Sequence, residues 1–373
     1  MAKGYSQETK LVQTGNRRDE TTGAVNAPIY MSTAYRHSGV GESTGYDYAR
    51  TKNPTRDVLE EAIADLEMGS RGFACSSGMA AIQTVLSLFE QGDEIIASLD
   101  LYGGTYRLFQ QFWPKWGVNI QYVDPRNLEL LEEAITDNTR ALFIETPTNP
   151  QMQEADIQQI QAIAKRNNVL LIVDNTFYTP LLQKPLEEGA DIVIHSATKY
   201  LGGHNDLVAG LIAVKDPAIG EKLFDIQNGI GMTLGAFDCW LLVRGMKTLS
   251  LRMKKHEENA KEVAVYLDEH PLVKEVLYPG KGGMLSFRVT NPELVDPLLR
   301  NLSLITFAES LGGVESLMTY PSSQTHADVP EHVRLEIGID ETLMRMSCGI
   351  ESANDLTNDL RYAFEEAAKL VNV

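Results

Sequence analysis

The chain has 373 residues, 43% apolar and 23% charged, which is ordinary for a globular protein and long enough for two or three compact units. Its formal net charge of −18 argues against nucleic acid or an anionic membrane as a partner. Three cysteines without CxxC spacing argue against a disulfide framework and a zinc site, and no run of about 18 apolar residues offers a membrane span. The first ten residues have no apolar core typical of a signal peptide, so we expect a cytoplasmic protein without a metal.

The N-terminal residues 1–52 are polar, rich in Gly and Tyr, and poorly periodic, which predicts an extended arm that contacts a neighbouring subunit. A helix is expected to follow, because Asn53 can cap it and Pro54 suits its first position. Its apolar face would consist of Val58, Leu59, Ala62, Ile63 and Leu66.

Short apolar runs then alternate with helical patterns. The runs are "GFACSS", "EIIASL", "ALFIET", "VLLIVD" and "DIVIHS", with helical stretches such as "GMAAIQTVLSLF" and "ADIQQIQAIAKR" between them. This alternation predicts an α/β fold over residues 53–245, with a mostly parallel sheet covered by helices. Residues 246–373 contain longer helical patterns, a predicted strand at "GGMLSFRV" and an amphipathic helix from Asn354 onward, which predicts a smaller C-terminal α/β domain.

Lys199 is the first candidate for chemistry, because it follows the apolar run "DIVIHS" and ligands gather at the carboxyl ends of parallel strands. Desolvation disfavours the charged form of a lysine, and a neutral amine can form a Schiff base, including one with pyridoxal phosphate (PLP). Taken alone, Lys199 is more typical of a strand-end lysine whose ammonium reaches water.

Other residues match the remaining needs of PLP. Asp174 ends "VLLIVD" and can hold the proton of the ring nitrogen, although a strand-end Asp is commonly a helix cap. The helix start in "SSGMAAIQ", with the hydroxyls of Ser196 and Thr198, can bind a phosphate, and Tyr102 can stack on the ring. Each signal is weak alone, but their shared position at strand ends favours a PLP site.

Six motifs support this interpretation: "YARTKNPT", "SSGMAA", "YGGTYR", "ETPTNP", "VDNTF" and "HSATKYLGGH". They resemble the signatures of the PLP-dependent enzymes of cysteine and methionine metabolism, and the similarity runs from about Tyr30 to the C-terminus. That family includes cystathionine γ-synthase, cystathionine γ- and β-lyases, methionine γ-lyase and the acylhomoserine sulfhydrylases. The resemblance implies a type I PLP-dependent transferase fold with a seven-stranded-type sheet, and a homotetramer built as a dimer of dimers with shared active sites.

The resemblance also implies roles in cofactor binding. Lys199 would carry PLP as a Schiff base and move protons, Asp174 would pair with the ring nitrogen, and Tyr102 would stack on the ring and share the proton transfers. Asn149 would lie near the ring hydroxyl and the substrate. The residues implied for the phosphate are Gly78, Met79, Ser196 and Thr198, with Tyr48 and Arg50 reaching it from the neighbouring subunit.

Four residues are implied as substrate contacts. Arg345 would bind the substrate α-carboxylate, since a guanidinium makes a planar two-point contact with a carboxylate, although an isolated arginine of this kind is more often a surface residue. Arg107 would hold a distal carboxylate. Glu315 would bind the ammonium of an incoming cysteine, with Ser316 beside it, but Glu315 suits equally well a helix start that favours negative charge.

The reaction class also follows from resemblance. "TLGAFDCWLLVRGMKTL" and "FAESLGGVESL" look most like cystathionine γ-synthases of Bacillus-like bacteria that also act as O-acetylhomoserine thiolyases. The implied reaction replaces the acyl group of an O-acylhomoserine by cysteine, or by sulfide. Thr51 follows Arg50, so no second arginine is there for a succinyl tail, which favours the acetyl ester. The continuous "LYPGKGGMLSF" and the lack of the long insertion of many dedicated sulfhydrylases depart from relatives.

Three alternatives remain open at this point. A lyase that splits cystathionine or methionine would use the same cofactor and almost the same residues. A catalytically silent ligand-binding homologue would not need Lys199, Asp174 and Arg345 together. A nicotinamide dinucleotide enzyme would need GxGxxG after the first strand, which the chain lacks.

Overall fold

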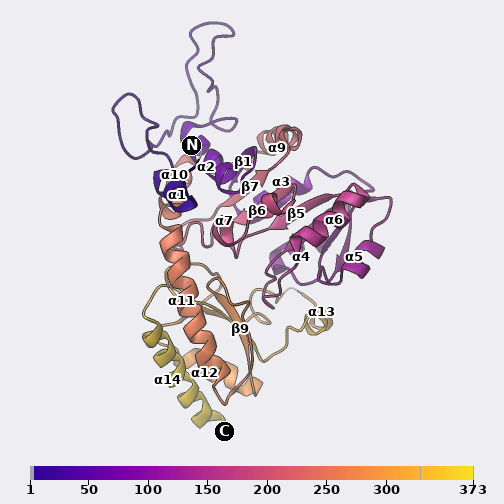
Figure 1. Ribbon diagram of the computed structural model, residues 1–373, viewed down its shortest axis with the longest axis vertical. Helices are drawn as coiled ribbons and strands as arrows, with labels where there is room; N and C mark the ends of the chain where they lie inside the picture. Colours follow the sequence, from indigo (N-terminus) through magenta and orange to yellow (C-terminus); the bar gives the residue numbers. More distant parts are fainter. Residues whose placement is uncertain (1–3, 328, 373) are drawn as a thin grey trace. The chain divides into compact units, whose positions relative to one another are not determined.

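The computed structural model describes residues 4–327 and 329–372, which form two compact units that are interleaved along the chain (Figure 1). The first unit contains the chain up to Asp93, the short piece Arg140–Leu142, and Ile157–Ser250. The second unit contains Glu94–Thr139, Phe143–Asp156 and the chain from Leu251 onward. The division at residues 52 and 245 stays a prediction.

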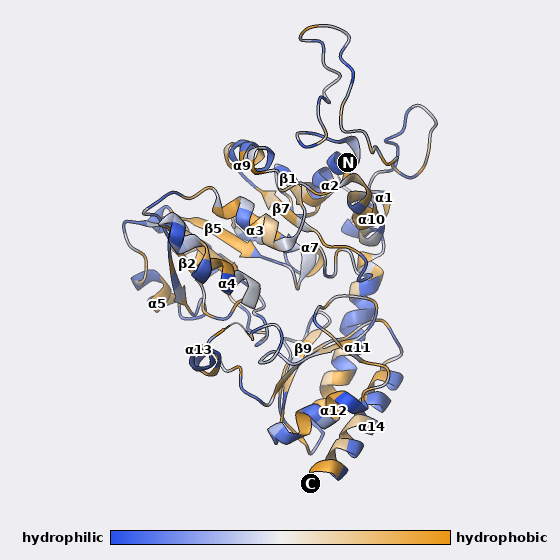
Figure 2. Cartoon of the chain, turned by 180° about the vertical axis from the view of Figure 1, so that it is seen from behind, coloured by the Kyte–Doolittle hydropathy of each residue, from blue (hydrophilic) through white to orange (hydrophobic). Residues whose placement is uncertain are grey.

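A sheet forms the centre of the first unit. Its strand order is β1 (Arg71–Cys75), β7 (Gly210–Val214), β6 (Ile192–Ser196), β5 (Leu170–Asp174) and the first part of β4 (Thr139–Glu145). Strands β5 and β6 are parallel, whereas β7 is antiparallel to both of its neighbours. Almost every residue of these strands is buried, and Figure 2 shows β5 in the orange of apolar side chains. Apolar runs of this kind are typical of strands covered on both faces.

Helices of the first unit follow the predicted alternation. They are α1 (Gln7–Gln13), α2 (Pro54–Leu66), α3 (Gly78–Leu86), α6 (Ile157–Asn167), α7 (Thr179–Leu182), α8 (Pro185–Glu188), α9 (Pro217–Ile230) and α10 (Ala236–Met246). The predicted start of α2 is confirmed, because the Asn53 side chain accepts from the amides of Thr55 and Arg56 at 2.9 and 3.2 Å, and Pro54 is the first helical residue. All five residues of its predicted apolar face are buried.

The N-terminal segment between α1 and α2 is largely exposed and contains no helix or strand apart from an isolated bridge between Ala34 and Tyr48. Apolar side chains on it remain in contact with water: Val25 is 75% and Met31 71% exposed. The predicted arm of residues 1–52 is thus extended after α1, but the prediction was wrong for Gln7–Gln13, which form that helix. Contact of the arm with another subunit stays a prediction.

The second unit contains two groups of strands. The end of β4 is followed in strand order by β2 (Glu94–Ser98) and β3 (Asn119–Val123), with β2 and β3 parallel. A separate five-stranded sheet has the order β10 (Thr306–Phe307), β11 (Leu317–Thr319), β12 (Leu343–Ser347), β9 (Met284–Val289) and β8 (Val273–Leu277). The predicted strand at "GGMLSFRV" is β9, and only six residues, 278–283, join it to β8.

Helices of the second unit include α4 (Gly103–Gln111), α5 (Leu128–Glu133), α12 (Val295–Asn301), α13 (Glu331–Glu336) and α14 (Ala353–Val371), while α11 (Leu249–Asp268) begins in the first unit and continues into the second. The predicted C-terminal amphipathic helix is α14, which buries Leu356, Leu360, Ala363 and Phe364 in one apolar core with α12 and the five-stranded sheet. Figure 2 shows α14 with both orange and blue residues along its length. No helix among the described residues is long and apolar enough to cross a membrane.

Candidate active site

The turn that carries Lys199 follows strand β6 directly. The Lys199 amide donates to the Ser196 carbonyl at 3.2 Å, and the Lys199 carbonyl accepts from the Gly203 amide at 2.8 Å. The Thr198 hydroxyl bonds the backbone of Ala209, accepting from its amide at 3.0 Å and donating to its carbonyl at 3.2 Å. These bonds fix the backbone of the partly buried Lys199 just beyond the end of the strand.

The start of helix α3 lies against the end of β6. Ser77 caps the helix by accepting from the Ala80 amide at 3.0 Å, and Gly78 and Met79 form its first turn. A Cβ on Gly78 would lie 2.9 Å from both Cβ and Oγ of Ser196, so only glycine lets the helix start approach Ser196 this closely. Amides at a helix start beside a hydroxyl form a natural anion site, which fits a phosphate.

Asp174 is the last residue of β5 and is 8% exposed. Its Oδ1 accepts from the amide and the hydroxyl of Thr176 at 3.0 and 2.5 Å. Burial raises the pKa of this carboxyl group, while the Thr176 hydrogen bonds and the charge of His195 act in the opposite direction. A buried carboxyl group of this kind is stabilised in its ionised form by a cation, which a protonated pyridine nitrogen supplies.

These features occur together at one edge of the first unit's sheet. Strands β5 and β6 are hydrogen-bonded neighbours and run parallel, so Asp174 and the Lys199 turn extend from the same end of the sheet. An amine, a buried carboxyl group and an anion-binding helix start are the set that PLP needs. The residues present therefore fit the predicted cofactor.

In the second unit, Tyr102 precedes helix α4 and is 39% exposed. Its amide donates to Oε2 of Glu145 at 2.8 Å. The two glycines that follow are sterically required: a Cβ on Gly103 would lie 2.1 Å from the Thr325 carbonyl oxygen, and one on Gly104 would lie 2.4 Å from the Tyr102 ring. The "YGG" motif thus packs the phenol ring over the first turn of α4.

Arg345 lies in strand β12 and is only 1% exposed. Its Nη1 donates to Oδ1 of Asn149 at 2.7 Å, and its Nη2 donates to the Thr319 hydroxyl at 3.1 Å and the Ser310 carbonyl at 3.2 Å. The structure therefore brings together Arg345 and Asn149, both of which the family resemblance implied as site residues. Their contact holds the guanidinium in a fixed plane, as two-point recognition of a carboxylate requires.

Three residues around this arginine were missed by the sequence analysis. Thr319 and Ser310 hold the guanidinium, and Ser310 has a left-handed φ of 132°, a conformation that is strained for a residue with a side chain. His326 is 1% exposed; its Nε2 donates to the Leu101 carbonyl at 3.4 Å, and its Nδ1 lies 2.9 Å from the Thr325 hydroxyl oxygen. Burial and the charge of Arg345 lower the pKa of His326 to about 4. The quoted motif "FAESLGG" contains Ser310, but its contact is made by a backbone carbonyl, which side-chain chemistry does not reveal.

The other predicted substrate contacts differ in their surroundings. Ser316 is fully buried; its hydroxyl donates to Glu351 Oε2 at 2.9 Å and accepts from the Gly349 amide at 2.8 Å. Glu315 and Arg107 are exposed. The hydroxyl of Ser316 is thus occupied by partners within the chain, whereas Glu315 and Arg107 lie at the surface.

Tyr48 and Arg50 also lie in the first unit. They line a separate cavity of about 270 Å³ together with Tyr30, Ser32 and Thr233. Tyr48 is 51% exposed, and the Arg50 guanidinium lies 5.7 Å from the centre of its ring. Their predicted contact with the cofactor phosphate of a neighbouring subunit stays a prediction.

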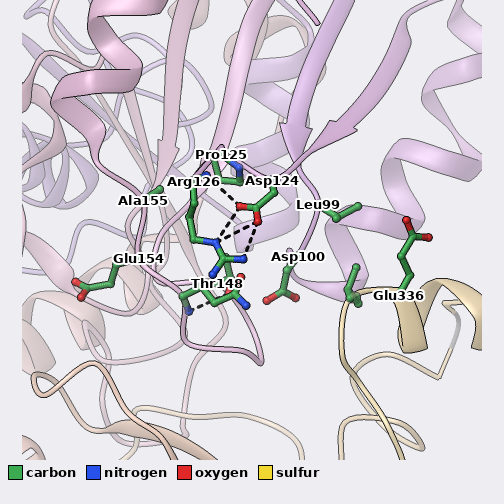
Figure 3. A pocket seen from close by; sticks show the side chains of 11 residues that line it. Leu99, Asp100, Asp124, Pro125, Arg126, Thr148, Glu154, Ala155 and Glu336 are labelled. Atoms are coloured by element: carbon green, nitrogen blue, oxygen red, sulfur yellow. Dashed lines mark hydrogen bonds and ion pairs between the residues drawn. The ribbon is translucent and has the colours of Figure 1, made fainter. Parts of the chain in front are cut away.

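A further cavity of about 130 Å³ in the second unit is lined by Asp100, Asp124, Arg126, Thr148 and Glu336, among others (Figure 3). Arg126 is bound to Asp124, with Nη2 and Oδ2 2.7 Å apart. Burial raises the pKa of Asp100 to about 6, and Thr148 and the Gln151 amide act against that rise. None of the predicted site residues lines this cavity, so it has no part in the predicted chemistry.

Comparison with known proteins identifies the family. The family model of Cys/Met metabolism PLP-dependent enzymes matches residues 8–365. This chain belongs to that family. Its members depend on PLP, so the chain is a PLP-dependent enzyme of cystathionine metabolism whose cofactor is bound to a lysine as a Schiff base. The predicted family, fold class, enzyme class and cofactor are confirmed.

Individual relatives include both synthases and lyases. The chain is 63% identical over 356 residues to cystathionine gamma-synthase/O-acetylhomoserine (thiol)-lyase of Bacillus subtilis, covering 95% of each chain. It is 47% identical to cystathionine gamma-lyase of the same organism, covering 96% of this chain and 99% of the relative. Among solved structures, cystathionine gamma synthase from Xanthomonas oryzae pv. oryzae, in complex with aminoacrylate and cysteine, is 39% identical with a TM-score of 0.96 and covers 98% of this chain and 99% of that one.

Proposed function

We propose that this enzyme is a cystathionine γ-synthase of methionine biosynthesis. It replaces the acyl group of an O-acylhomoserine by cysteine to give cystathionine, and it also accepts sulfide to give homocysteine. The observation that carries the proposal is the 63% and 56% identity to two γ-synthases along nearly the whole chain, against 47% to the cystathionine γ-lyase of Bacillus subtilis and the β-lyase of Lactococcus lactis. The γ-synthase of Xanthomonas oryzae pv. oryzae is more distant, at 39%. The acetyl ester is the favoured substrate, because Thr51 stands where a second cation beside Arg50 would hold a succinyl tail.

The proposed cofactor contacts use the residues at the strand ends. Lys199 holds PLP, the carboxylate of Asp174 holds the proton of the ring nitrogen, and the ring of Tyr102 packs on the ring face with Asn149 at its hydroxyl. The start of α3 at Gly78 and Met79 binds the phosphate with Ser196 and Thr198. Tyr48 and Arg50 reach the phosphate of a neighbouring subunit, in a cytoplasmic homotetramer assembled as a dimer of dimers.

The bound cofactor supplies an electron-accepting ring that makes the C–H bonds beside the substrate amine acidic. Lys199 Nζ acts as the mobile base: it takes the proton from Cα, then one from Cβ, and returns them after the exchange at Cγ. At Cγ the C–O bond breaks, the acyl carboxylate leaves, and a C–S bond forms to the thiol. Tyr102 shares the proton transfers through its phenol oxygen.

Substrate orientation is assigned to the second unit's residues. Arg345, held by Asn149 and Thr319, binds the α-carboxylate through charge-assisted N–H···O bonds. Glu315 binds the ammonium of the incoming cysteine, and Arg107 a distal carboxylate. We leave Ser316 out of this set, because its hydroxyl is engaged by Glu351 and Gly349.

A product assay tests the proposal. The purified protein is incubated with O-acetylhomoserine, cysteine and sulfide, and the products are identified by mass spectrometry. We expect both cystathionine and homocysteine. O-Succinylhomoserine in a parallel reaction tests the acyl preference. Lys199→Ala should lose the visible absorbance of the Schiff base and all turnover.

The second candidate is a lyase, which the 47% identity to cystathionine lyases over nearly the whole chain favours as an alternative. In that reaction elimination takes the place of the second thiol. Degradation of added cystathionine to an oxo-acid and ammonia, without formation of cystathionine from O-acetylhomoserine, would replace the synthase proposal by this one.

A further inference from the structure

A buried acid–imidazole pair lies behind the strand ends of the first unit. Glu67 follows the last residue of α2, and His195 lies in β6 immediately before Ser196. His195 Nε2 and Glu67 Oε1 are 2.6 Å apart, and both side chains are fully buried. Burying such a pair costs free energy unless its geometry is good, so its presence in the interior calls for a structural or chemical reason.

Asn175 connects this pair to the neighbouring strand end. It follows Asp174 in the chain, and its Nδ2 donates to Glu67 Oε1 at 3.2 Å and to the Gln183 carbonyl at 3.0 Å. Its amide donates to the Ile194 carbonyl of β6 at 2.9 Å. A single carboxylate oxygen of Glu67 therefore binds one residue adjacent to Asp174 and another four positions before Lys199.

We propose that Glu67 is a positioning residue for the cofactor site: it holds Asn175 and His195, and through them the strand ends that carry Asp174 and Lys199. The inference deepens the proposed function and rests on the roles assigned there to Asp174 and Lys199. Glu67 does not touch the cofactor in this proposal. It acts only through the residues that it binds.

Charge adds to the mechanical effect. The Glu67 carboxylate can only accept, so His195 Nε2 is the donor of the bond between them. Positive charge at His195 lowers the pKa of Asp174, against the effect of burial. The pair thus supports the ionised form of Asp174, which is the form that holds a pyridine N–H.

The chain offers a matched control on the same helix. Glu60 is 19% exposed in its side chain, accepts from the Ala74 amide at 3.0 Å and pairs with Arg56 Nε at 3.3 Å. It has neither Asn175 nor His195 among these partners. Glu60→Gln therefore removes a largely buried carboxylate from α2 without altering the bonds that the proposal invokes.

The test measures the dissociation constant for added PLP, using protein stripped of cofactor, and the thermal midpoint of the same preparations. Glu67→Gln should weaken PLP binding about tenfold, the effect of one hydrogen bond to a charged group. Glu60→Gln should bind PLP as the wild type does, even if its thermal midpoint falls as far as that of Glu67→Gln. His195→Gln, which retains a donor toward Glu67 but loses the ring, should also weaken PLP binding.

Two results would overturn the inference. The first is wild-type PLP affinity in Glu67→Gln. If Glu67→Gln does not fold, wild-type PLP affinity in His195→Gln takes its place. The other is equal weakening in Glu60→Gln, which would assign the effect to general stability. A wild-type protein that forms no visible Schiff-base band with PLP, or a Lys199→Ala variant that retains the band, would instead refute the proposed cofactor site itself.

Discussion

Arg345 and Asn149 are 196 positions apart in the chain, and their side chains share a hydrogen bond of 2.7 Å between Nη1 and Oδ1. The bond joins strand β12 to the segment after β4, both within the second unit. Thr319 adds a second side-chain contact to the same guanidinium, at 3.1 Å. A buried arginine held at two of its nitrogens has little rotational freedom, so its N–H groups point in fixed directions.

The first prediction concerns this fixed geometry. In Arg345→Lys, an ammonium replaces the planar fork and cannot bind Asn149, Thr319 and a carboxylate in the same arrangement. We expect the KM for O-acetylhomoserine to rise about ten- to a hundredfold, with a smaller loss of kcat. Steady-state kinetics measure both constants. Arg300→Lys, at an exposed residue paired with Asp296, is the control and should leave both unchanged; an unchanged KM in Arg345→Lys would exclude the assigned role.

The second prediction concerns the glycines of the "YGG" motif. A Cβ on Gly103 would lie 2.1 Å from the Thr325 carbonyl oxygen, which is backbone and cannot rotate away. Gly103→Ala should therefore reduce the free energy of unfolding by about 2 kcal/mol or more. Urea denaturation followed by circular dichroism measures the change.

Gly229 provides the opposite case, because it lies inside α9 and a Cβ there would meet no atom within 4 Å. Gly229→Ala should raise stability by about 0.5 kcal/mol, since alanine loses less backbone entropy in a helix. Equal destabilisation by both substitutions would show that the close approach at Gly103 is not the cause.

The third prediction is a pH dependence from His326. Burial and the charge of Arg345 lower its pKa from 6.5 to about 4, so the folded chain keeps this imidazole neutral where the unfolded chain protonates it. The unfolded state then binds more protons below pH 6.5, and stability falls as the pH falls through the window from 6.5 to 4. The loss between pH 7 and pH 5 should be about 2 kcal/mol from this residue.

His326→Gln removes the titrating group and keeps hydrogen-bonding capacity toward Leu101. The difference in unfolding free energy between pH 7 and pH 5 should accordingly be smaller in the variant than in the wild type by about 2 kcal/mol. An identical pH dependence in both proteins would mean that His326 is protonated or exposed in the folded state.

The sequence predicted those parts of the molecule that local chemistry determines. Asn53 and Pro54 mark the start of α2 because capping depends on adjacent residues, and the apolar runs identified β1, β2, β4, β5 and β6. Lys199 and Asp174 were found because a strand end is visible in the sequence as the end of an apolar run.

Contacts between distant segments were not predictable in this way. Strand β7 was missed, since it returns from β6 without an intervening helix and so breaks the strand–helix alternation. The partners of Arg345 were unknown before the sheet pairing of β11 with β12 placed Thr319 directly opposite it. Glu67 and His195 are 128 positions apart, and neither lies in a pattern that predicts a buried pair.

The fourth prediction separates the charge of Asp174 from its structural contacts. In Asp174→Asn, Oδ1 can still accept from the Thr176 amide and hydroxyl, so the fold should be retained. The amide cannot hold the proton of a ring nitrogen, so we expect kcat to fall about a hundredfold or more. Because burial opposes ionisation of Asp174, removing the charge should not reduce the unfolding free energy of the cofactor-free protein.

Asp359 in the second unit is the matched control. Its two carboxylate oxygens accept from the amides of Ser303, Leu304 and Ile305, and its pKa is lowered by those hydrogen bonds against the effect of burial. Asp359→Asn would turn an NH₂ group toward backbone donors and should cost about 2 kcal/mol of stability with kcat unchanged. Two results would contradict the assignment. Loss of kcat in Asp359→Asn would show that kcat follows stability in general. Wild-type kcat in Asp174→Asn would show that catalysis needs no carboxylate at the ring nitrogen.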